Sequence, residues 1–177
     1  KGIVLVHILG NSTDMDVAMK IADDRGMIVM EDTCESLTSK FNSKYLGSFG
    51  DMGTFSFYFS HHMTTIEGGM ITCKNSFDYN LLKCIRSHGW TRYGDNELNN
   101  IHKGINNKFC FVEIGYNLRP MEFQAAMGSV QLNFIDKRNE IRKKNYYNIT
   151  TGINNYYKNN NIIKIPITTG GCDAQWF

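Results

Sequence analysis

The first thirty-two residues alternate between apolar runs and an amphipathic stretch, and this alternation constrains the fold most. Residues 3–9 form a nearly continuous apolar run, as expected for a strand buried on both faces, and residues 27–30 form a second one. Asp14 and Gly26 bracket the stretch between them, and they are residue types that begin and end helices. The order strand, helix, strand predicts an α/β fold with parallel strands. Ligands of such folds bind at the carboxyl ends of the strands, where Asp32 lies.

Composition excludes several classes of protein. The chain has 177 residues, of which 42% are hydrophobic, so it is long enough to bury a sizeable core. Its net charge is only +2, and it has no apolar run of roughly 18 residues, so we expect neither nucleic acid nor a membrane among its partners. Five cysteines without C-x-C or C-x-x-C spacing predict no metal site. With no signal peptide recognised, this cysteine usage favours the cytoplasm.

The remaining chain gives a coarser outline. Residues 54–59 and 70–73 are typical of further strands, and Ser76 is suited to cap the helix that follows. Pro120 is suited to open a long helix that runs into a charged stretch, which is typical of a solvated helix face. The tail from Asn145 is rich in Asn and Tyr and is interpreted as a linker.

Three clusters of residues could carry chemistry, and each also has a structural interpretation. Asp32 and Glu35 follow a buried strand, where carboxylates also serve as turn or helix caps. Ser56 lies among large apolar residues and could be a core serine. His61 and His62 are adjacent, so they point in different directions and are unsuited to share one metal ion; a pair in a surface loop is the plain alternative.

Together and in this order, these clusters resemble the DegT/DnrJ/EryC1/StrS family of pyridoxal 5'-phosphate (PLP) sugar aminotransferases. The resemblance covers most of residues 2–135, and its blocks are Glu31-Asp32-Thr33-Cys34-Glu35-Ser36, Gly47-Ser48-Phe49-Gly50-Asp51, Phe55-Ser56-Phe57-Tyr58, Glu67-Gly68-Gly69-Met70 and Gly115-Tyr116-Asn117-Leu118-Arg119-Pro120. It implies an aspartate-aminotransferase-like fold (fold type I), with a mostly parallel sheet flanked by helices. Residues 1–145 would then be part of the PLP-binding large domain, without its N-terminal part, and residues 146–177 the start of the small C-terminal domain.

The resemblance also implies roles for four residues. Asp32 matches the aspartate that pairs with the pyridine nitrogen of the cofactor, and Ser56 matches the serine that binds its phosphate. Asn117 matches an asparagine that reaches the phosphate bound by the partner subunit, which implies a homodimer with shared active sites. Glu35 occupies the position over the cofactor ring where the aminotransferases usually have Gln or His, which is a departure from the family pattern.

The decisive departure is His61. Five residues after the phosphate-binding serine, the family's aminotransferases have the lysine that bonds covalently to PLP, and here the residue is histidine. Imidazole cannot form that bond, but it can act as a general base. This change resembles the family's sugar 3-dehydratases, and residues 59–65 resemble their GDP-linked branch most. By the same resemblance, His88 and Arg92 would lie near the sugar nucleotide.

The sequence therefore predicts a PLP-dependent sugar 3-dehydratase, a lyase of deoxysugar biosynthesis for surface polysaccharides such as O-antigen. The resemblance implies that an amino donor such as glutamate converts PLP to pyridoxamine 5'-phosphate, and that the substrate is a nucleotide-linked 4-keto-6-deoxy sugar. CDP-linked dehydratases carry an iron–sulfur cluster and are disfavoured because no C-x-C pair is present. Two alternatives stay open: a sugar aminotransferase with an unusual residue at the lysine position, and a non-catalytic fragment or degenerate homologue.

Overall fold

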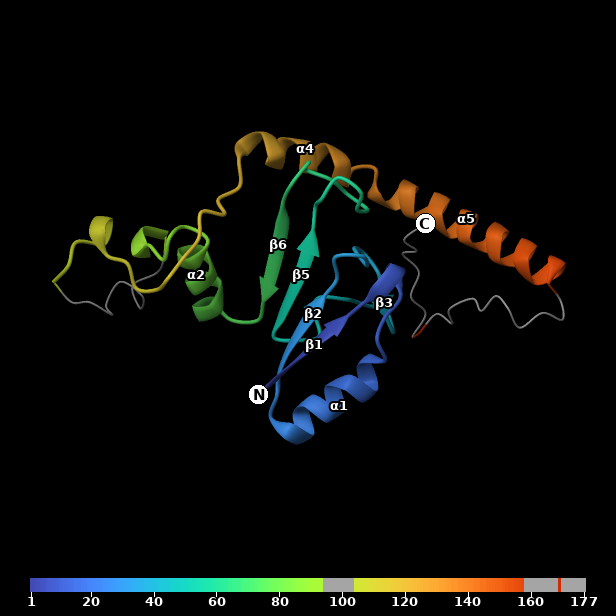
Figure 1. Ribbon diagram of the computed structural model, residues 1–177, viewed down its shortest axis with the longest axis horizontal. Coiled ribbons are helices and arrows are strands. Elements are labelled where there is room, and N and C mark those ends of the chain that lie inside the picture. The colour runs from blue at the N-terminus through green and yellow to red at the C-terminus, as the bar shows by residue number, and fades with distance from the viewer. Residues whose placement is uncertain (94–103, 158–168, 170–177) are drawn as a thin grey trace. The chain divides into compact units, whose positions relative to one another are not determined.

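The main feature of the computed structural model is a four-stranded sheet (Figure 1). The structure describes residues 1–93, 104–157 and 169. The strand order is β1 (Gly2–Val6), β2 (Ile28–Asp32), β5 (Met52–Ser56) and β6 (Gly69–Cys73). The pairs β1–β2 and β2–β5 are parallel, and Figure 1 shows β6 running antiparallel to β5. The prediction of an α/β fold with a mostly parallel sheet is therefore confirmed.

The chain divides into two compact units, and each is described by itself. The first contains residues 1–72 and the chain from Phe123 onward, and the second contains Cys73–Glu122. The first unit holds β1, β2, β5, most of β6 and three helices, α1 (Met15–Arg25), most of α4 (Glu122–Leu132) and α5 (Ile135–Tyr156). It also holds the short turn η1 (Ile8–Gly10) and a two-stranded hairpin, β3 (Lys40–Phe41) with β4 (Lys44–Tyr45).

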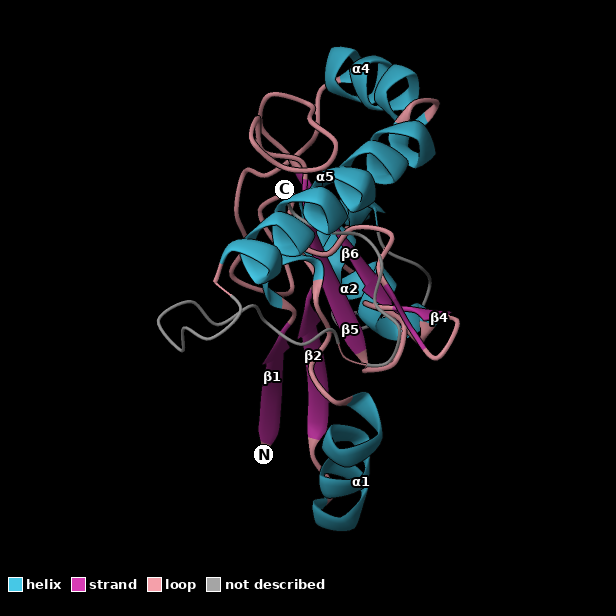
Figure 2. Cartoon of the chain, turned by 90° about the vertical axis from the view of Figure 1, so that its right-hand side faces the viewer, coloured by secondary structure: helices cyan, strands magenta, loops and turns pink. Residues whose placement is uncertain are grey.

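The hydrophobic core of the first unit is formed by residues of α1, β1, β2 and the hairpin region. Figure 2 shows how α1 leads into the start of β2. Its buried members are Leu5, Met15, Ala18, Ala22, Val29, Phe41 and Leu46. The expectation that β1 and β2 are buried on both faces is wrong for the described chain. Val4 is 60% exposed and Ile28 63% exposed, because α1 covers only the face to which Leu5 and Val29 point.

The two predicted boundaries of α1 are confirmed. The Asp14 carboxylate accepts a hydrogen bond from the Val17 amide at 3.2 Å, and Gly26 ends the helix in the left-handed conformation with a φ of 58°. The helix thus returns the chain to the start of β2, which places β2 parallel to β1. This local geometry brings the carboxyl ends of both strands to one edge of the sheet.

Three expectations about the other helices need correction. The cap of α2 (Ser76–Ile85) is Asn75, whose Oδ1 accepts the Asp78 amide at 2.8 Å, so Ser76 is the first helical residue. The predicted long helix after Pro120 is two helices, because the chain breaks at Asn133 and Phe134 between α4 and α5. The interpretation of the tail from Asn145 as a linker is wrong for its first residues, because α5 continues through Asn145 to Tyr156. No described helix is long and apolar enough to span a membrane.

The second unit contains α2 and two short turns, η2 (Thr91–Tyr93) and η3 (Asn107–Phe109). Isolated bridges join Ser87 to Asn117 and Trp90 to Phe111. At Gly89 the backbone is left-handed, with a φ of 76°, and a Cβ there would lie 1.8 Å from the carbonyl oxygen of Glu113. Only glycine allows this close approach of two backbone segments.

We expect Gly89→Ala to lower the free energy of unfolding by about 2 kcal/mol or more, because the added methyl group meets a backbone carbonyl. Gly104→Ala is the matched control, since Gly104 also has a positive φ (89°) but nothing lies within 4 Å of its would-be Cβ. Urea unfolding of both variants separates the steric effect from the cost of the backbone conformation. Equal losses in the two variants would contradict the steric explanation.

Candidate active site

Asp32 and Ser56 lie on neighbouring strands at the carboxyl edge of the sheet. In the parallel register Asp32 of β2 pairs with Thr54 of β5, so their side chains share one face of the sheet. Ser56 lies two residues beyond Thr54, and its side chain points to that same face. The structure thus brings together the two residues that the family resemblance assigns to opposite ends of one cofactor.

The Asp32 and Ser56 side chains each accept one backbone hydrogen bond. The Oδ1 atom of Asp32 accepts the Cys34 amide hydrogen at 3.0 Å, which fixes the carboxylate at the last residue of the strand. The Oγ atom of Ser56 accepts the Tyr58 amide hydrogen at 3.2 Å. Because the Ser56 oxygen is an acceptor in that bond, its own hydrogen is available to donate to a phosphate oxygen. Asp32 and Ser56 are both half-buried.

His61 lies in the loop that joins β5 to β6. This loop is closed at its base by two backbone hydrogen bonds of Phe57, one to Gly68 and one from Thr65, each 2.9 Å long. The His61 amide donates to the Tyr58 carbonyl at 3.1 Å, and its half-buried ring packs edge-on against the Tyr58 ring at 5.9 Å between centroids. The same Tyr58 bonds to Ser56 through its amide, so two adjoining contacts connect His61 to Ser56 along the chain.

Glu35 contacts the loop that follows β1. Its Oε2 atom accepts the amide hydrogen of Leu9 at 2.9 Å. Leu9 has a φ of 55°, a conformation that non-glycine residues seldom adopt, so the carboxylate stabilises an unfavourable turn. This contact places Glu35 at the same carboxyl edge as Asp32, since Asp32 is the last residue of β2 and Glu35 follows it by three residues.

His88, Arg92 and Asn117 belong to the second unit. The His88 amide donates to the Tyr116 carbonyl at 2.8 Å, which places His88 beside the segment that contains Asn117. The Arg92 guanidinium lies 5.2 Å from the ring centroid of Trp90. Asn117 accepts two hydrogen bonds from the Arg119 guanidinium at 3.3 and 3.4 Å. All three side chains are exposed.

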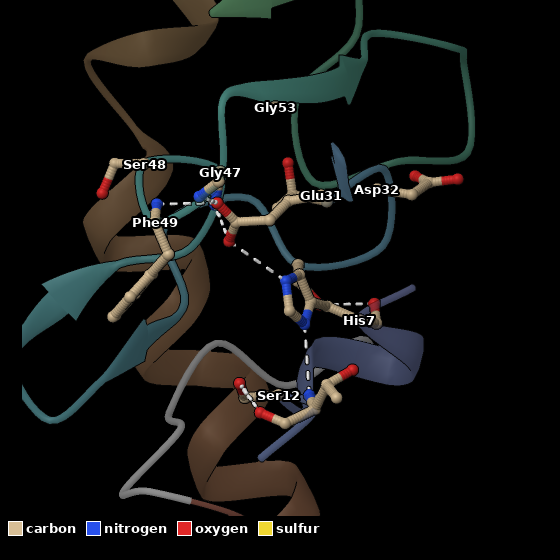
Figure 3. A network of polar contacts seen from close by, with 12 residues as sticks. His7, Ser12, Glu31, Asp32, Gly47, Ser48, Phe49 and Gly53 are labelled. Carbon is tan, nitrogen blue, oxygen red and sulfur yellow. Dashed lines mark hydrogen bonds and ion pairs between the residues drawn. The ribbon is translucent and has the colours of Figure 1, made fainter. Parts of the chain in front are cut away.

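Sequence reasoning missed Glu31, which is the centre of a network of polar contacts in the first unit (Figure 3). Its buried carboxylate accepts three backbone amide hydrogens at 2.7 Å, from Gly47, Phe49 and Gly50, and also contacts the buried His7 ring. Burial alone would raise the pKa of Glu31, but the bonds from His7 and the three amides together hold that pKa below its usual range. The sequence signal that was available is the carboxylate inside a buried strand.

Four of the five cysteines lie among the described residues. Cys84 and Cys110 are buried, Cys34 and Cys73 are half-buried and all four are free thiols, while Cys172 lies outside the described residues. Burial first, and then the hydrogen bond and charge of Asp32, raise the pKa of the Cys34 thiol to about 11. Among residues 1–93, 104–157 and 169, no three His, Cys, Asp or Glu side chains form a group that could hold a metal ion.

Comparison with known proteins decides the family. Residues 1–170 match the profile of the DegT/DnrJ/EryC1/StrS aminotransferase family. The chain belongs to this family. It is 39% identical over 182 residues to GDP-4-keto-6-deoxy-D-mannose 3-dehydratase of Yersinia pseudotuberculosis, covering 100% of this chain and 44% of that protein. It is 42% identical over 149 residues to the enzyme of the same name from Escherichia coli O55:H7, covering 82% of this chain and 38% of that protein.

Solved structures confirm the aminotransferase-like fold that the resemblance implied. The Escherichia coli GDP-4-keto-6-deoxy-D-mannose-3-dehydratase with bound hydrated PLP matches with a TM-score of 0.81 at 35% identity, over 98% of this chain and 45% of that one. A crystal structure of a GDP-4-keto-6-deoxymannose-3-dehydratase with a trapped PLP-glutamate geminal diamine matches with a TM-score of 0.85 at 36% identity, over 98% of this chain and 45% of that one. The DegT/DnrJ/EryC1/StrS chain described here thus spans less than half the length of the relatives that it matches.

We expect Asp32→Asn to lower the pKa of the Cys34 thiol, because the carboxylate charge that disfavours the thiolate is removed. At pH 8.5 the thiolate fraction grows about tenfold for each unit by which the pKa falls, so alkylation of Cys34 becomes faster. Peptide-resolved mass spectrometry after timed alkylation measures the rate. Asp24→Asn, which changes an exposed carboxylate on α1, is the control, and an unchanged Cys34 rate in Asp32→Asn would contradict the assignment.

Proposed function

We propose that this chain is part of a PLP-dependent 3-dehydratase, which removes the C3 hydroxyl of a GDP-linked 4-keto-6-deoxy sugar. The observation that carries the proposal is His61, which follows Ser56 by five residues in the loop beyond β5. A lysine at this position would attach the cofactor covalently, and a histidine leaves only proton transfer. One solved relative of this chain is a dehydratase variant in which a histidine is changed to lysine and the serine before it to asparagine, and Ser60-His61 has the same order.

The residues at the sheet edge fit PLP or pyridoxamine 5'-phosphate. A carboxylate on one strand end and a free hydroxyl hydrogen on the next are the partners that a pyridinium nitrogen and a phosphate require. When bound, the cofactor supplies an electron sink that lets a carbon beside the C3 hydroxyl carry developing negative charge. Relatives with bound PLP and with a PLP-glutamate adduct support glutamate as the amino donor.

Each residue of the first unit then has a defined task. Asp32 holds the proton on the pyridine nitrogen, and Ser56 donates its hydroxyl hydrogen to the phosphate. His61 would be the base that accepts a proton from the methylene carbon of the bound cofactor, and its protonated ring would return a proton to the departing C3 hydroxyl, which leaves as water. Without a covalent lysine, hydrogen bonds alone hold the cofactor, so it exchanges more readily. Glu35, whose carboxylate accepts the Leu9 amide hydrogen, would lie over the cofactor ring.

Three residues of the second unit keep the roles that the family resemblance implies for them. His88 and the Arg92 guanidinium bind the sugar nucleotide, since a guanidinium suits a diphosphate. Asn117 reaches the phosphate bound by the partner subunit, so the enzyme is a homodimer with shared active sites. Relatives named for lipopolysaccharide biosynthesis and GDP-perosamine synthesis support a place in surface-polysaccharide deoxysugar synthesis. The proposed location of this enzyme is the cytoplasm. The division into a large domain (1–145) and the start of a small domain (146–177) stays part of the proposal.

The full-length enzyme, assayed with PLP, glutamate and the GDP-linked 4-keto-6-deoxy sugar, should release ammonia and a product that has lost the C3 oxygen. His61→Gln should lower turnover by about a hundredfold or more, because the proton acceptor is lost. His62→Gln is the matched control, since it changes the neighbouring imidazole, and it should keep its turnover. A stable product with a new amino group would instead establish the aminotransferase, and absence of turnover with bound cofactor would support a degenerate homologue.

A mixture of two inactive variants tests the shared active site. If Asn117 serves the partner's site, a heterodimer of one His61→Gln subunit and one Asn117→Ala subunit has two different sites. One site carries both substitutions, and the other carries neither. The mixture should therefore recover part of the wild-type activity after subunit exchange. No recovery, in a mixture shown by native mass spectrometry to contain heterodimers, would contradict the role of Asn117.

A further inference from the structure

Glu31 and His7 form a fully buried pair beneath the end of β2, directly beside Asp32 in the chain (Figure 3). Four N–H groups converge on the two oxygens of the Glu31 carboxylate. Oε1 accepts the amide hydrogens of Phe49 and Gly50, and Oε2 accepts the Gly47 amide hydrogen and faces Nε2 of His7 at 3.3 Å. An ionised carboxylate is the side chain that accepts at every one of these positions.

The contacts of His7 fix its tautomer. Its Nδ1 atom accepts the amide hydrogen of Thr13 at 3.2 Å, so that nitrogen carries no proton. The ring hydrogen therefore lies on Nε2, and His7 donates it to Glu31. The backbone amide of His7 donates to the carbonyl of Asp32 at 3.0 Å. One residue thus holds both the side chain of Glu31 and the main chain of Asp32.

The two acidic side chains point in opposite directions from β2, as Figure 3 shows. Consecutive residues of a strand alternate between faces, so any rotation of the strand end that moves Asp32 must also move Glu31. The contacts of Glu31 with residues 47–50 and with His7 oppose such a rotation. Residues 47–50 in turn lead directly into β5, whose end carries Ser56.

We propose that Glu31 and His7 are positioning residues, which lock the end of β2 so that the Asp32 carboxylate keeps its direction toward the cofactor. The inference rests on the proposed function and adds two residues to its machinery. Neither residue would touch the cofactor, because both are fully buried and Glu31 points away from the face that Asp32 and Ser56 share. The pair acts by holding Asp32, and through residues 47–50 it also holds the start of β5.

The test uses Glu31→Gln in the full-length enzyme. The amide nitrogen of glutamine must face two N–H donors, and His7 cannot change tautomer to accept from it, because Nδ1 would then meet the Thr13 amide hydrogen. Asp51→Asn is the matched control. Its carboxylate also accepts a β2 amide hydrogen, that of Val29 at 2.8 Å, but three residues before Asp32. His7→Phe, which keeps the ring shape and loses both ring bonds, is the second variant.

Two readouts separate positioning from general stability. The first is PLP titration: we expect Glu31→Gln to weaken PLP binding by roughly tenfold, and to lower the pH at which the absorbance of the bound cofactor changes, because Asp32 no longer holds the ring proton. The second needs no cofactor: alkylation of Cys34 should become faster, since the Cys34 amide is bonded to the Asp32 carboxylate and its thiol is sensitive to that charge. His7→Phe should shift both readouts in the same direction.

The outcomes are distinct. Changes in both readouts for Glu31→Gln, with Asp51→Asn showing only a lower melting temperature, support the proposal. A folded Glu31→Gln enzyme with wild-type PLP binding, spectrum and Cys34 rate would overturn it, as would equal changes in the Asp51→Asn control. If the wild-type enzyme binds no PLP, the proposed function fails, and an unchanged Cys34 rate in Glu31→Gln then overturns the positioning role as well.

Discussion

The rest of the first unit depends on the burial of a negative charge beneath its sheet. An ionised carboxylate without partners inside a protein costs several kcal/mol, so Glu31 is tolerated only where donors surround it. Three amides of residues 47–50 and the ring of His7 provide those donors. The carboxylate therefore ties together three segments that are distant in sequence, namely the end of β1, the end of β2 and the turn that leads into β5.

This constraint also determines where the candidate active site lies. Because β1, β2 and β5 are parallel, their carboxyl ends meet at one edge, and each continues into a loop that carries a polar residue. The Glu31 network holds the inner face of that edge, and Asp32 and Ser56 share the opposite face. Glu31 and Asp32 are adjacent in β2, but consecutive residues of a strand point to opposite faces of the sheet. Glu31 is therefore buried, and Asp32 is half-buried on the other face.

Local signals in the sequence predicted the local structure well and the longer elements less well. The caps of α1 at Asp14 and Gly26 were predictable, because capping depends on hydrogen bonds within one turn. Ser76 was a reasonable cap, but Asn75 reaches the Asp78 amide, and the choice between two adjacent polar residues depends on backbone angles. The break at Phe134 and the continuation of α5 past Asn145 were not predictable, since weak helix propensities are easily overridden by tertiary contacts such as the Asn139–Thr38 hydrogen bond.

The sequence by itself determined the family and the identity of the candidate residues, because the order and spacing of Asp32, Ser56 and His61 are properties of the chain alone. Only the tertiary structure decided which of two adjacent acidic residues faces the core. Glu31 and Asp32 are indistinguishable as carboxylates in the sequence, and their directions follow from the register of β2 between β1 and β5. His7 and Glu31 are twenty-four residues apart and meet only because the parallel pairing brings their strand ends together, which no local pattern encodes.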